Sequence, residues 1–339
     1  MKKLKNKGII LFLLAAVALY IAIYVVPSVP GFFDKTYVAE FGELTVFDEE
    51  PGYFVRSETV YLADASGNVR RLVDEDTLLR AGTPAVEVTT GGEPEEIPED
   101  LQTAMDRFNG KVVRGEGYRV AEGGLVSFFF DGYEGVLDLE QAEKSRYGFF
   151  SSIGDDCVVK LSGENVKEGY PVFKSIRNDI WYLVLYVSQD HLERYRVGRR
   201  VYVSVDRSEE ETSEVEMRVY SAAPESDKGK IILYTDNYLP RLGELRKAQV
   251  KVETSRTSGL IIQKDSIVEQ DGVMGVFVKD ATDEFNFTPV NILDSDDNTA
   301  VVSASSFYDE EGNYVYTIDP FDDIMVAPEE EEEAENEEK

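Results

Sequence analysis

One histidine and one cysteine limit the catalytic chemistry that this 339-residue chain can perform. A Ser-His-Asp or Cys-His constellation would have to use His191, yet no Gly-x-Ser-x-Gly motif accompanies it. His191 lies in a segment predicted to be a short helix after Ser188, and we expect it to be exposed and structural. Cys157 precedes two valines, which predicts a half-buried thiol in a strand. No catalytic residue is therefore predicted.

Metal sites are equally poorly supported by the sequence. Zinc takes three or four Cys, His or carboxylate ligands, and a single His and a single Cys argue against such a site. Calcium takes oxygen ligands, and Asp294-Ser295-Asp296-Asp297-Asn298 is the best local cluster. The cluster lacks the EF-hand spacing and its final Glu, which favours a solvated turn. We therefore predict no bound metal.

The acidic character of the chain decides which partners are excluded. The formal net charge of −31 repels phosphate backbones, so the sequence predicts that nucleic acid is not a partner. Several arginines stand out against this charge: Arg194, Arg196, Arg199, Arg200 and the pair Arg70-Arg71. They could form a basic spot for anionic lipid, cell-wall polymer or an acidic partner. Ion pairs with nearby Glu and Asp are the favoured interpretation.

The stretch from residue 58 to residue 88 has the pattern of half a small β-barrel. Apolar residues alternate over residues 60–62, 69–73 and 85–88, and turn residues separate these runs. Gly82 precedes Thr83-Pro84 in the last of the turns. Glycine adopts a positive φ at little steric cost, so we expect a turn at this position.

The same pattern returns about ninety residues later. Residues 76–86 are echoed by residues 163–173, with Gly82 and Pro84 matched by Gly169 and Pro171. Ser66-Gly67 before one alternating run is likewise matched by Gly123-Gly124 before residues 125–130. Two half-motifs separated by an insertion resemble a barrel-sandwich (lipoyl-like) domain of the HlyD-type periplasmic adaptor, or membrane fusion protein, family.

The resemblance covers roughly residues 35–323 and implies a mainly β fold built of several domains. Strands are expected at residues 180–187, 201–205, 215–220, 231–234 and 249–253 in a β-barrel, and alternation returns from Leu260 with turns at Asp271-Gly272 and Glu311-Gly312. The implied domains are the barrel-sandwich (37–90 and 111–177, with a short hairpin remnant at 91–110), the β-barrel (178–256) and a membrane-proximal β domain (257–327), completed by the strand that leaves the membrane.

Two insertions are predicted, one between the half-motifs at residues 89–110 and one within the second half-motif at residues 132–156. Leu101, Ala104, Met105 and Phe108 have helical spacing after Pro98, which predicts one helix of about three turns. Adaptors of this family often carry a long two-helix coiled coil here, but this segment has no heptad repeat. In the other insertion, residues 137–147 are a possible helix. Lipoyl and biotinyl carriers present a lysine at the joining hairpin; Lys111 lies at its end without the flanking pattern, so we predict no covalent cofactor.

The N-terminus has the pattern of a membrane anchor. Residues 9–26 are apolar and without charge, and at about 1.5 Å per residue they span roughly 27 Å, close to the thickness of the hydrocarbon core. Lysines in the preceding residues 1–8 place that tail in the cytoplasm. A cleaved signal peptide is the alternative, but no Ala-x-Ala-like site follows. The glutamate-rich residues 328–339 are expected to be a disordered tail.

These features together predict a single-pass, extracytoplasmic, non-catalytic adaptor of an efflux or secretion transporter. The resemblance implies a membrane transporter, with an ABC-type permease as one candidate, and further copies of the chain as partners, and the anchor implies the lipid bilayer. The alternative is a cell-envelope or cell-division scaffold that reuses the fold without transport. An envelope hydrolase is a third hypothesis, but the 66 acidic residues always allow a carboxylate pair to be imagined, so they give it no specific support.

Overall fold

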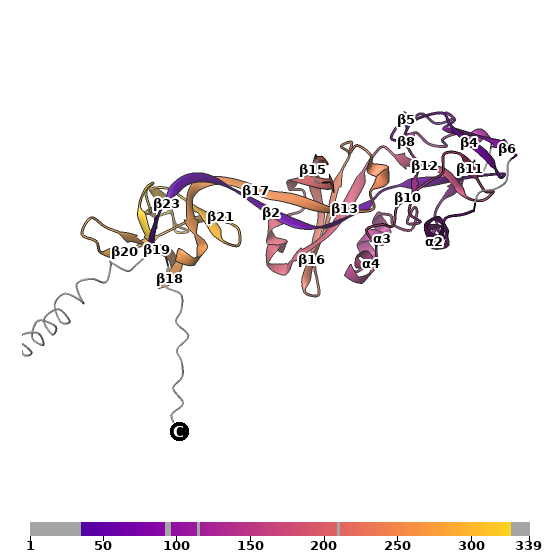
Figure 1. Ribbon diagram of the computed structural model, residues 1–339. Helices are drawn as coiled ribbons and strands as arrows, with labels where there is room; N and C mark the ends of the chain where they lie inside the picture. Colours follow the sequence, from indigo (N-terminus) through magenta and orange to yellow (C-terminus); the bar gives the residue numbers. More distant parts are fainter. Residues whose placement is uncertain (1–34, 92–95, 114–115, 209–210, 327–339) are drawn as a thin grey trace, which may run out of the picture. The chain divides into compact units, whose positions relative to one another are not determined.

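The computed structural model describes residues 35–326, except 92–95, 114–115 and 209–210. The chain divides into two compact units, one of Phe47–Ser255 and one of the described residues within Met1–Val46 and Arg256–Lys339. Strands dominate both units (Figure 1), as the sequence predicted. The expected cytoplasmic tail, transmembrane helix and acidic tail lie outside the described residues. Within the described part, no helix has the length and apolar character needed to cross a membrane.

A sandwich of two sheets forms one end of the Phe47–Ser255 unit. The larger sheet has the order β5-β8-β12-β3-β7 and the smaller one the order β11-β4-β6, with a separate β9-β10 pair. The elements are β3 (Glu58–Leu62), β4 (Gly67–Arg71), β5 (Leu78–Leu79), β6 (Val86–Thr90), β7 (Val112–Val113), η4 (Glu116–Tyr118), β8 (Gly124–Ser127), β9 (Phe129–Phe130), β10 (Val159–Lys160), β11 (Asn165–Val166) and β12 (Pro171–Arg177). Side chains from both half-motifs share one core, in which the rings of Tyr61 and Phe173 stack 4.1 Å apart.

The two half-motifs fold into matching loops. Gly82 and Gly169 have φ values of 83° and 82°, a conformation that glycine adopts with little strain. The Gly82 N–H donates to the carbonyl of Val120, and the Gly169 N–H donates to the carbonyl of Ala63. Each loop therefore closes on the opposite half of the sandwich, which explains the repeat seen in the sequence.

A second pair of glycines allows neighbouring strands to approach closely. A Cβ atom on Gly67 would lie 2.2 Å from the carbonyl oxygen of Thr89, and one on Gly124 would lie 2.4 Å from that of Ile176. Both distances are well inside van der Waals contact. Glycine at these two strand starts is thus required by the packing of adjacent backbones.

The first insertion contains the predicted helix, α2 (Glu99–Arg107). It begins after Pro98, whose fixed φ suits the start of a helix. Ala104 is fully buried, and Leu101 and Met105 pack beside it against the larger sheet of the sandwich. The apolar spacing in the sequence was therefore a reliable signal of this helix.

The second insertion differs from the expected helix over residues 137–147. It contains two short helices, α3 (Leu139–Lys144) and α4 (Tyr147–Ser151). The Asp138 side chain caps α3 by accepting from the amide of Gln141. The backbone then becomes extended at Ser145, with φ −73° and ψ 143°, which ends the helix and turns the chain into α4.

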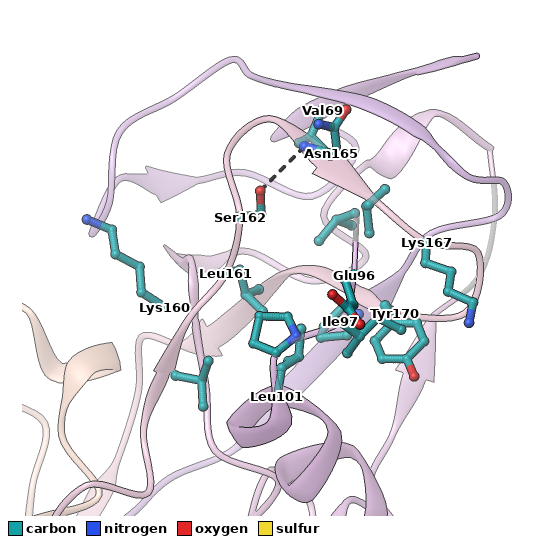
Figure 2. Close-up of a pocket in the computed structure, with 15 residues that line it drawn as sticks. Val69, Glu96, Ile97, Leu101, Lys160, Leu161, Ser162, Asn165, Lys167 and Tyr170 are labelled. Atoms are coloured by element: carbon teal, nitrogen blue, oxygen red, sulfur yellow. Dashed lines mark hydrogen bonds between the residues drawn. The ribbon is translucent and has the colours of Figure 1, made fainter. Parts of the chain in front are cut away.

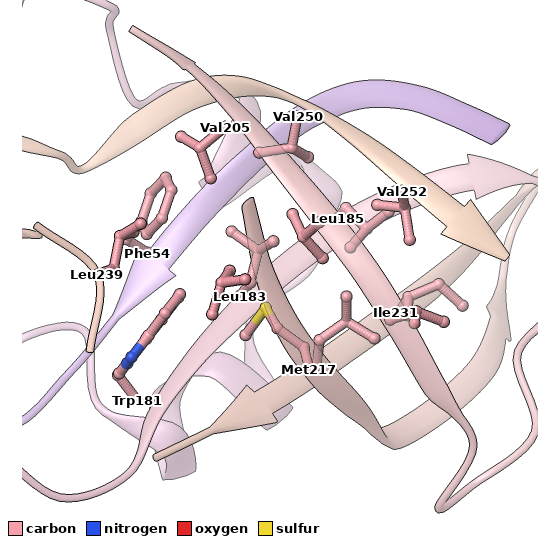
Figure 3. Close-up of a cluster of buried hydrophobic side chains, with 14 of the residues drawn as sticks. Phe54, Trp181, Leu183, Leu185, Val205, Met217, Ile231, Leu239, Val250 and Val252 are labelled. Carbon is pink, nitrogen blue, oxygen red and sulfur yellow. The ribbon is translucent and has the colours of Figure 1, made fainter. Parts of the chain in front are cut away.

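A closed barrel forms the rest of this unit. Its strands follow the order β14-β15-β16-β13-β2-β17, and β14 also pairs with β17. The elements are β2 (Glu40–Val55), β13 (Trp181–Ser188), η5 (Gln189–Arg194), β14 (Arg200–Ser208), β15 (Glu211–Glu225), β16 (Lys228–Thr235), η6 (Leu242–Glu244) and β17 (Lys247–Gln263). Figure 3 shows aliphatic side chains from these strands filling the interior beside Phe54 and Trp181, whose rings stack 5.9 Å apart.

The position of β2 corrects the expected domain boundary. The sequence interpretation assigned residues 37–57 to the barrel-sandwich. In the structure Tyr53–Val55 of β2 pair with β13, so this segment is a barrel strand. The error arose because β2 lies more than a hundred residues before β13 in the sequence, and alternation alone does not identify a strand's partner.

The other unit contains the strands that the alternation from Leu260 onward predicted. Its elements are β1 (Thr36–Val38), η7 (Lys264–Ser266), β18 (Val268–Gln270), β19 (Val273–Lys279), β20 (Phe285–Pro289), β21 (Ile292–Ser295), β22 (Thr299–Val302), β23 (Ser306–Tyr308), β24 (Tyr314–Tyr316) and β25 (Asp323–Met325). β1 pairs with β25, so the segment that precedes residue 40 completes this sheet, as expected. Asp271 and Gly272 both have positive φ and form the predicted two-residue hairpin between β18 and β19.

Candidate functional site

Six charged side chains are sealed inside the Phe47–Ser255 unit. They are Arg56, Glu58, Asp131, Glu134, Lys174 and Arg246, and each side chain is at most 1% exposed. Three are cations and three are anions, so the buried network is neutral overall. Charges removed from water destabilise a fold unless they are paired and hydrogen-bonded, so the mutual geometry of these six groups is decisive.

The network draws its members from the sandwich, its second insertion and the barrel. Arg56 and Glu58 lie where the chain passes from β2 to β3, and Lys174 lies in β12. Asp131 follows β9, and Arg246 immediately precedes β17. The buried network therefore joins the barrel-sandwich to the barrel.

Glu58 is the central anion. Its Oε1 accepts from Arg56 Nε at 2.9 Å and from Lys174 Nζ at 2.8 Å, while its Oε2 accepts from Arg246 Nη2 at 2.5 Å. Burial alone would raise the pKa of this carboxyl, but the three cations outweigh that effect and hold its pKa well below its usual range. Glu58 is consequently ionised at neutral pH.

Asp131 and Glu134 complete the network from the turn after β9. Asp131 Oδ2 accepts from Arg246 Nε at 3.0 Å, and Glu134 Oε1 accepts from Lys174 Nζ at 2.9 Å. Glu134 also accepts from the backbone amides of Asp131 and Gly132 at 3.0 and 2.8 Å. Burial and the nearby Asp131 carboxylate raise the pKa of Glu134. The turn is thus fixed by its own acidic residues.

Backbone groups of the barrel anchor the two arginines. Arg246 Nη1 donates to the Phe54 carbonyl at 2.9 Å, and the Phe54 amide donates to the Arg246 carbonyl at 2.9 Å. The Arg56 guanidinium donates to the Leu245 carbonyl. These groups are closed to solvent and offer no room for a substrate, so the buried network serves to hold the two domains together.

Sequence reasoning missed this network. Its six members are scattered from residue 56 to residue 246 in a chain in which 30% of residues are charged. The available signal was Lys174, a charge within the otherwise apolar start of β12, at Val172-Phe173. Its partners come from other strands, and only the fold brings them together.

His191, which we expected to be exposed, is half-buried. Its Nδ1 lies 2.7 Å from Asp48 Oδ1, and Asp48 also accepts from Arg194 at 2.9 Å and from the Tyr195 hydroxyl at 2.6 Å. The segment is the 3₁₀ turn η5, and the Ser188 hydroxyl donates to Asp190 and does not cap a helix. Asp48 is 4% exposed and gathers these groups on the barrel.

Removing the Asp48 carboxylate is expected to destabilise the barrel. The Asp48→Ala variant leaves the buried Tyr195 hydroxyl without its acceptor and separates His191 and Arg194 from their common anion. We expect a loss of about 2 to 3 kcal/mol in the free energy of unfolding, measured by urea denaturation. Glu193→Ala, at an exposed carboxylate of the same 3₁₀ turn, is the matched control and is expected to have no measurable effect. Equal stabilities of the two variants would contradict this role.

Cys157 lies just before β10 rather than within a strand, and its thiol is half-buried. Burial, assisted by the nearby Asp131 carboxylate, raises the pKa of this thiol to about 11. The thiolate is the reactive form, so iodoacetamide should alkylate Cys157 at pH 8 more than about a hundredfold more slowly than a free cysteine. The alkylation rate is expected to keep rising up to about pH 11. A plateau reached by pH 9 would show an ordinary thiol.

The aspartate cluster at residues 294–298 forms the β21–β22 turn. Asp296 Oδ1 accepts from the amides of Asn298 and Thr299 at 2.9 and 2.7 Å, which occupies this oxygen. These bonds help to lower the pKa of Asp296 against the opposing effect of burial. No group of three or more His, Cys, Asp or Glu residues within the described ranges is placed to hold a metal ion.

The candidate cations are engaged in separate local contacts. The observed contacts are Arg194 with Asp48, Arg200 with Glu216, Arg70 with Glu87, Lys111 with Glu122, and Arg71 with the Leu161 carbonyl and the Phe128 ring. Arg70 and Arg71 lie on the sandwich, whereas Arg194 and Arg200 lie on the barrel. The favoured interpretation, ion pairs with nearby carboxylates, therefore describes Arg194, Arg200 and Arg70.

A cavity of about 260 Å³ lies between the start of α2 and strands β10 and β11 (Figure 2). Aliphatic side chains such as Leu101, Leu161 and Val172 form much of its lining. Figure 2 shows the amino groups of Lys160 and Lys167 directed away from this aliphatic centre. The cavity is thus lined by both apolar and polar side chains, the polar ones including Glu96, Ser162 and Asn165.

Comparison with known proteins identifies the barrel. Residues 181–256 match the family model for the RND-related β-barrel domain. The matched segment runs from the start of β13 into β17 and leaves out β2, which the structure adds to the same barrel. The match confirms that these residues form a β-barrel domain, as the sequence predicted.

Among solved structures, similar chains include ZneB from Cupriavidus metallidurans, with 10% identity, coverage of 86% of this chain and 92% of that one, and a TM-score of 0.28. MacA from Actinobacillus actinomycetemcomitans has 10% identity, coverage of 87% and 100%, and a TM-score of 0.39. The membrane fusion protein Spr0693 from Streptococcus pneumoniae has 12% identity, coverage of 61% and 97%, and a TM-score of 0.25. These likenesses are distant. No curated protein sequence matches the chain.

Proposed function

We propose that the protein is a non-catalytic, membrane-anchored extracytoplasmic adaptor subunit of an efflux or secretion transporter. The observation that carries this proposal is the RND-related β-barrel domain at residues 181–256, joined to a barrel-sandwich within one compact unit. The barrel interior is filled by packed aliphatic side chains, and the charges between the two domains are paired and buried. Such a unit is suited to holding partners at a fixed spacing rather than to chemistry.

The buried charge network supports this role physically. An adaptor must keep its domains in a fixed relative position while its partners move. Six mutually paired charges lie between the sandwich and the barrel. A shift of one domain against the other would break these pairs and leave buried charges without their partners, which is costly. Polar networks of this kind favour one geometry over its alternatives.

The short tip of the sandwich limits what the adaptor can reach. The segment between β6 and β7 contains the helix α2, whose nine residues span about 14 Å. A long coiled-coil hairpin does not fit in residues 91–111. We therefore propose that this adaptor does not extend to an outer-membrane channel, which suits an envelope without an outer membrane, such as a Gram-positive one.

Anchoring and assembly belong to the same proposal. The apolar residues 9–26 would hold the chain in the cell membrane with its N-terminus in the cytoplasm and its β domains outside. The barrel and membrane-proximal domains would dock on the transporter, and further copies of the chain would complete a ring.

Crosslinking in intact cells tests the proposed partner. A photoreactive amino acid placed at exposed barrel position Tyr202 should capture a membrane permease, identified by mass spectrometry, together with further copies of the chain. The matched control carries the same photoreactive group at exposed Glu164 of the sandwich, where capture of the permease is not expected. Capture of division or wall-synthesis proteins without a permease would favour the scaffold hypothesis and overturn the adaptor proposal.

A further inference from the structure

The β23–β24 hairpin presents three tyrosines on one face. Tyr308 pairs directly with Tyr314, and Tyr316 follows two residues later, so the three rings point to the same side. The ring centroids of Tyr308 and Tyr314 are 5.7 Å apart, and those of Tyr314 and Tyr316 are 5.2 Å apart. The residues are 72%, 54% and 77% exposed. The hairpin thus displays a row of touching aromatic rings to solvent, which we call the tyrosine face.

The opposite face of the hairpin already supplies its packing. Phe307 and Val315 are paired on that side and are half-buried. Thr317 continues from β24, and its hydroxyl donates to the Pro289 carbonyl at 2.6 Å. A hairpin with one buried face ordinarily carries polar residues on the other, so three exposed tyrosines on that face are unusual. Contiguous exposed aromatic surface of this kind marks an interaction site.

Acidic side chains border the tyrosine face. The hairpin turn carries Asp309, Glu310 and Glu311, and the sequence has no Lys or Arg between residues 280 and 326. Asp309 Oδ1 accepts from the amides of Glu311 and Asn313 at 3.0 and 2.7 Å. The hydrogen bonds from Asn313 in particular lower the pKa of Asp309, so its charge persists in mildly acidic conditions.

We propose that the tyrosine face docks a basic, arginine-bearing segment of a protein partner. Guanidinium groups stack on tyrosine rings by cation–π attraction, and the neighbouring carboxylates complement their charge. Anionic lipid and nucleic acid are disfavoured, because the same carboxylates repel phosphate groups. The proposal goes beyond the adaptor role, since it holds for any partner with this chemistry, whether a transporter or a scaffold protein.

Peptide binding to the full-length protein tests the proposal. The probe is a synthetic twelve-residue peptide that alternates arginine with glycine, and its counterpart replaces each arginine by citrulline, which keeps the planar group without the charge. The tyrosine-face variant is Tyr308→Ser/Tyr314→Ser/Tyr316→Ser. Its matched control, Tyr202→Ser/Tyr220→Ser, removes two exposed tyrosines of the barrel. Circular dichroism verifies that both variants are folded.

Charge and lipid are tested in parallel. Glu310→Gln/Glu311→Gln neutralises the border of the tyrosine face, whereas Glu269→Gln/Glu284→Gln neutralises two exposed carboxylates elsewhere in the same unit. Tyr316→Trp provides a local fluorescent reporter, because the natural Trp181 is buried. Vesicles of phosphatidylglycerol and phosphatidylethanolamine serve as the lipid probe.

The expected result is arginine-peptide binding that weakens about tenfold in the tyrosine-face variant and several-fold in Glu310→Gln/Glu311→Gln, with both controls unchanged. The fluorescence of the Tyr316→Trp variant should respond to the arginine peptide and not to the citrulline peptide. Equal binding by the wild type and the tyrosine-face variant would overturn the proposal, because the peptide would then bind through general acidity. Vesicle binding that requires the three tyrosines would also overturn it, in favour of a lipid surface.

Discussion

Arg246→Met is expected to cause a loss of about 3 to 5 kcal/mol in the free energy of unfolding at pH 7. The guanidinium lies 2.5 Å from Glu58 and 3.0 Å from Asp131, and all three side chains are fully buried. Methionine fills a similar length without charge, so both carboxylates lose a counterion inside an apolar interior. Removing one member of a buried group of paired charges destabilises the fold much more than replacing all its members by apolar residues. Urea denaturation followed by circular dichroism measures the change.

The pH dependence of this loss gives a second, independent check. Glu58 has a pKa held well below its usual range, so it stabilises the wild type above about pH 4.5 and this contribution falls as the pH drops further. In Arg246→Met the carboxyl of Glu58 loses one of its cations, so its pKa should rise and it should take up a proton more readily. The stability difference between the two proteins should therefore be smaller at pH 4 than at pH 7.

Arg70→Met is the matched control for this prediction. Arg70 pairs with Glu87, but its side chain is 72% exposed, and exposed ion pairs contribute less than about 1 kcal/mol. Combining Arg246→Met with Asp131→Asn should recover part of the stability, because Asp131 is the carboxylate that loses its close cation, whereas Glu58 keeps Arg56 and Lys174. A loss in Arg246→Met no larger than that in Arg70→Met would show that the buried network does not hold the domains together.

Gly124→Ala is expected to destabilise the barrel-sandwich by about 2 to 3 kcal/mol. The added Cβ would lie 2.4 Å from the carbonyl oxygen of Ile176, an atom of the β12 backbone that pairs with β8. The neighbour is main chain in a paired strand rather than the end of a flexible side chain. The two strands must therefore separate, which weakens the sheet that both half-motifs share.

Gly148→Ala is the control substitution for this prediction. Gly148 lies in α4 with no atom within 4 Å of the position of its Cβ, and alanine favours helix over glycine by up to about 1 kcal/mol. We expect its midpoint of thermal unfolding to be unchanged or slightly raised, while that of Gly124→Ala falls. If both alanines lowered the midpoint equally, the close approach at Gly124 would not be the cause.

Local sequence patterns predicted much of the secondary structure. The helix at residues 99–107 followed from its apolar spacing and from Pro98, because a helix buries one stripe of residues that its own sequence specifies. The hairpin at Asp271-Gly272 followed from the two residues, since both accept a positive φ. The repeated Gly82 and Gly169 loops were visible for the same reason.

Pairings between residues far apart in the sequence could not be predicted from local patterns. β2 was assigned to the wrong domain because its alternation suits either sheet, and its pairing with β13 depends on residues more than a hundred positions away. The buried network was missed because its charges look like surface residues one at a time. The helix at residues 137–147 was divided at Ser145 by a change of chain direction that apolar spacing does not encode.

The sequence by itself determined where the strands, turns and the helix α2 form, and that the chain carries two matching halves, because these depend on contacts between residues close in the chain. The tertiary structure decided which strands close the barrel, which charges are buried and which tyrosines remain exposed. Those properties depend on residues brought together from distant positions in the sequence. A charge that becomes buried there destabilises the fold unless a charge of opposite sign pairs with it.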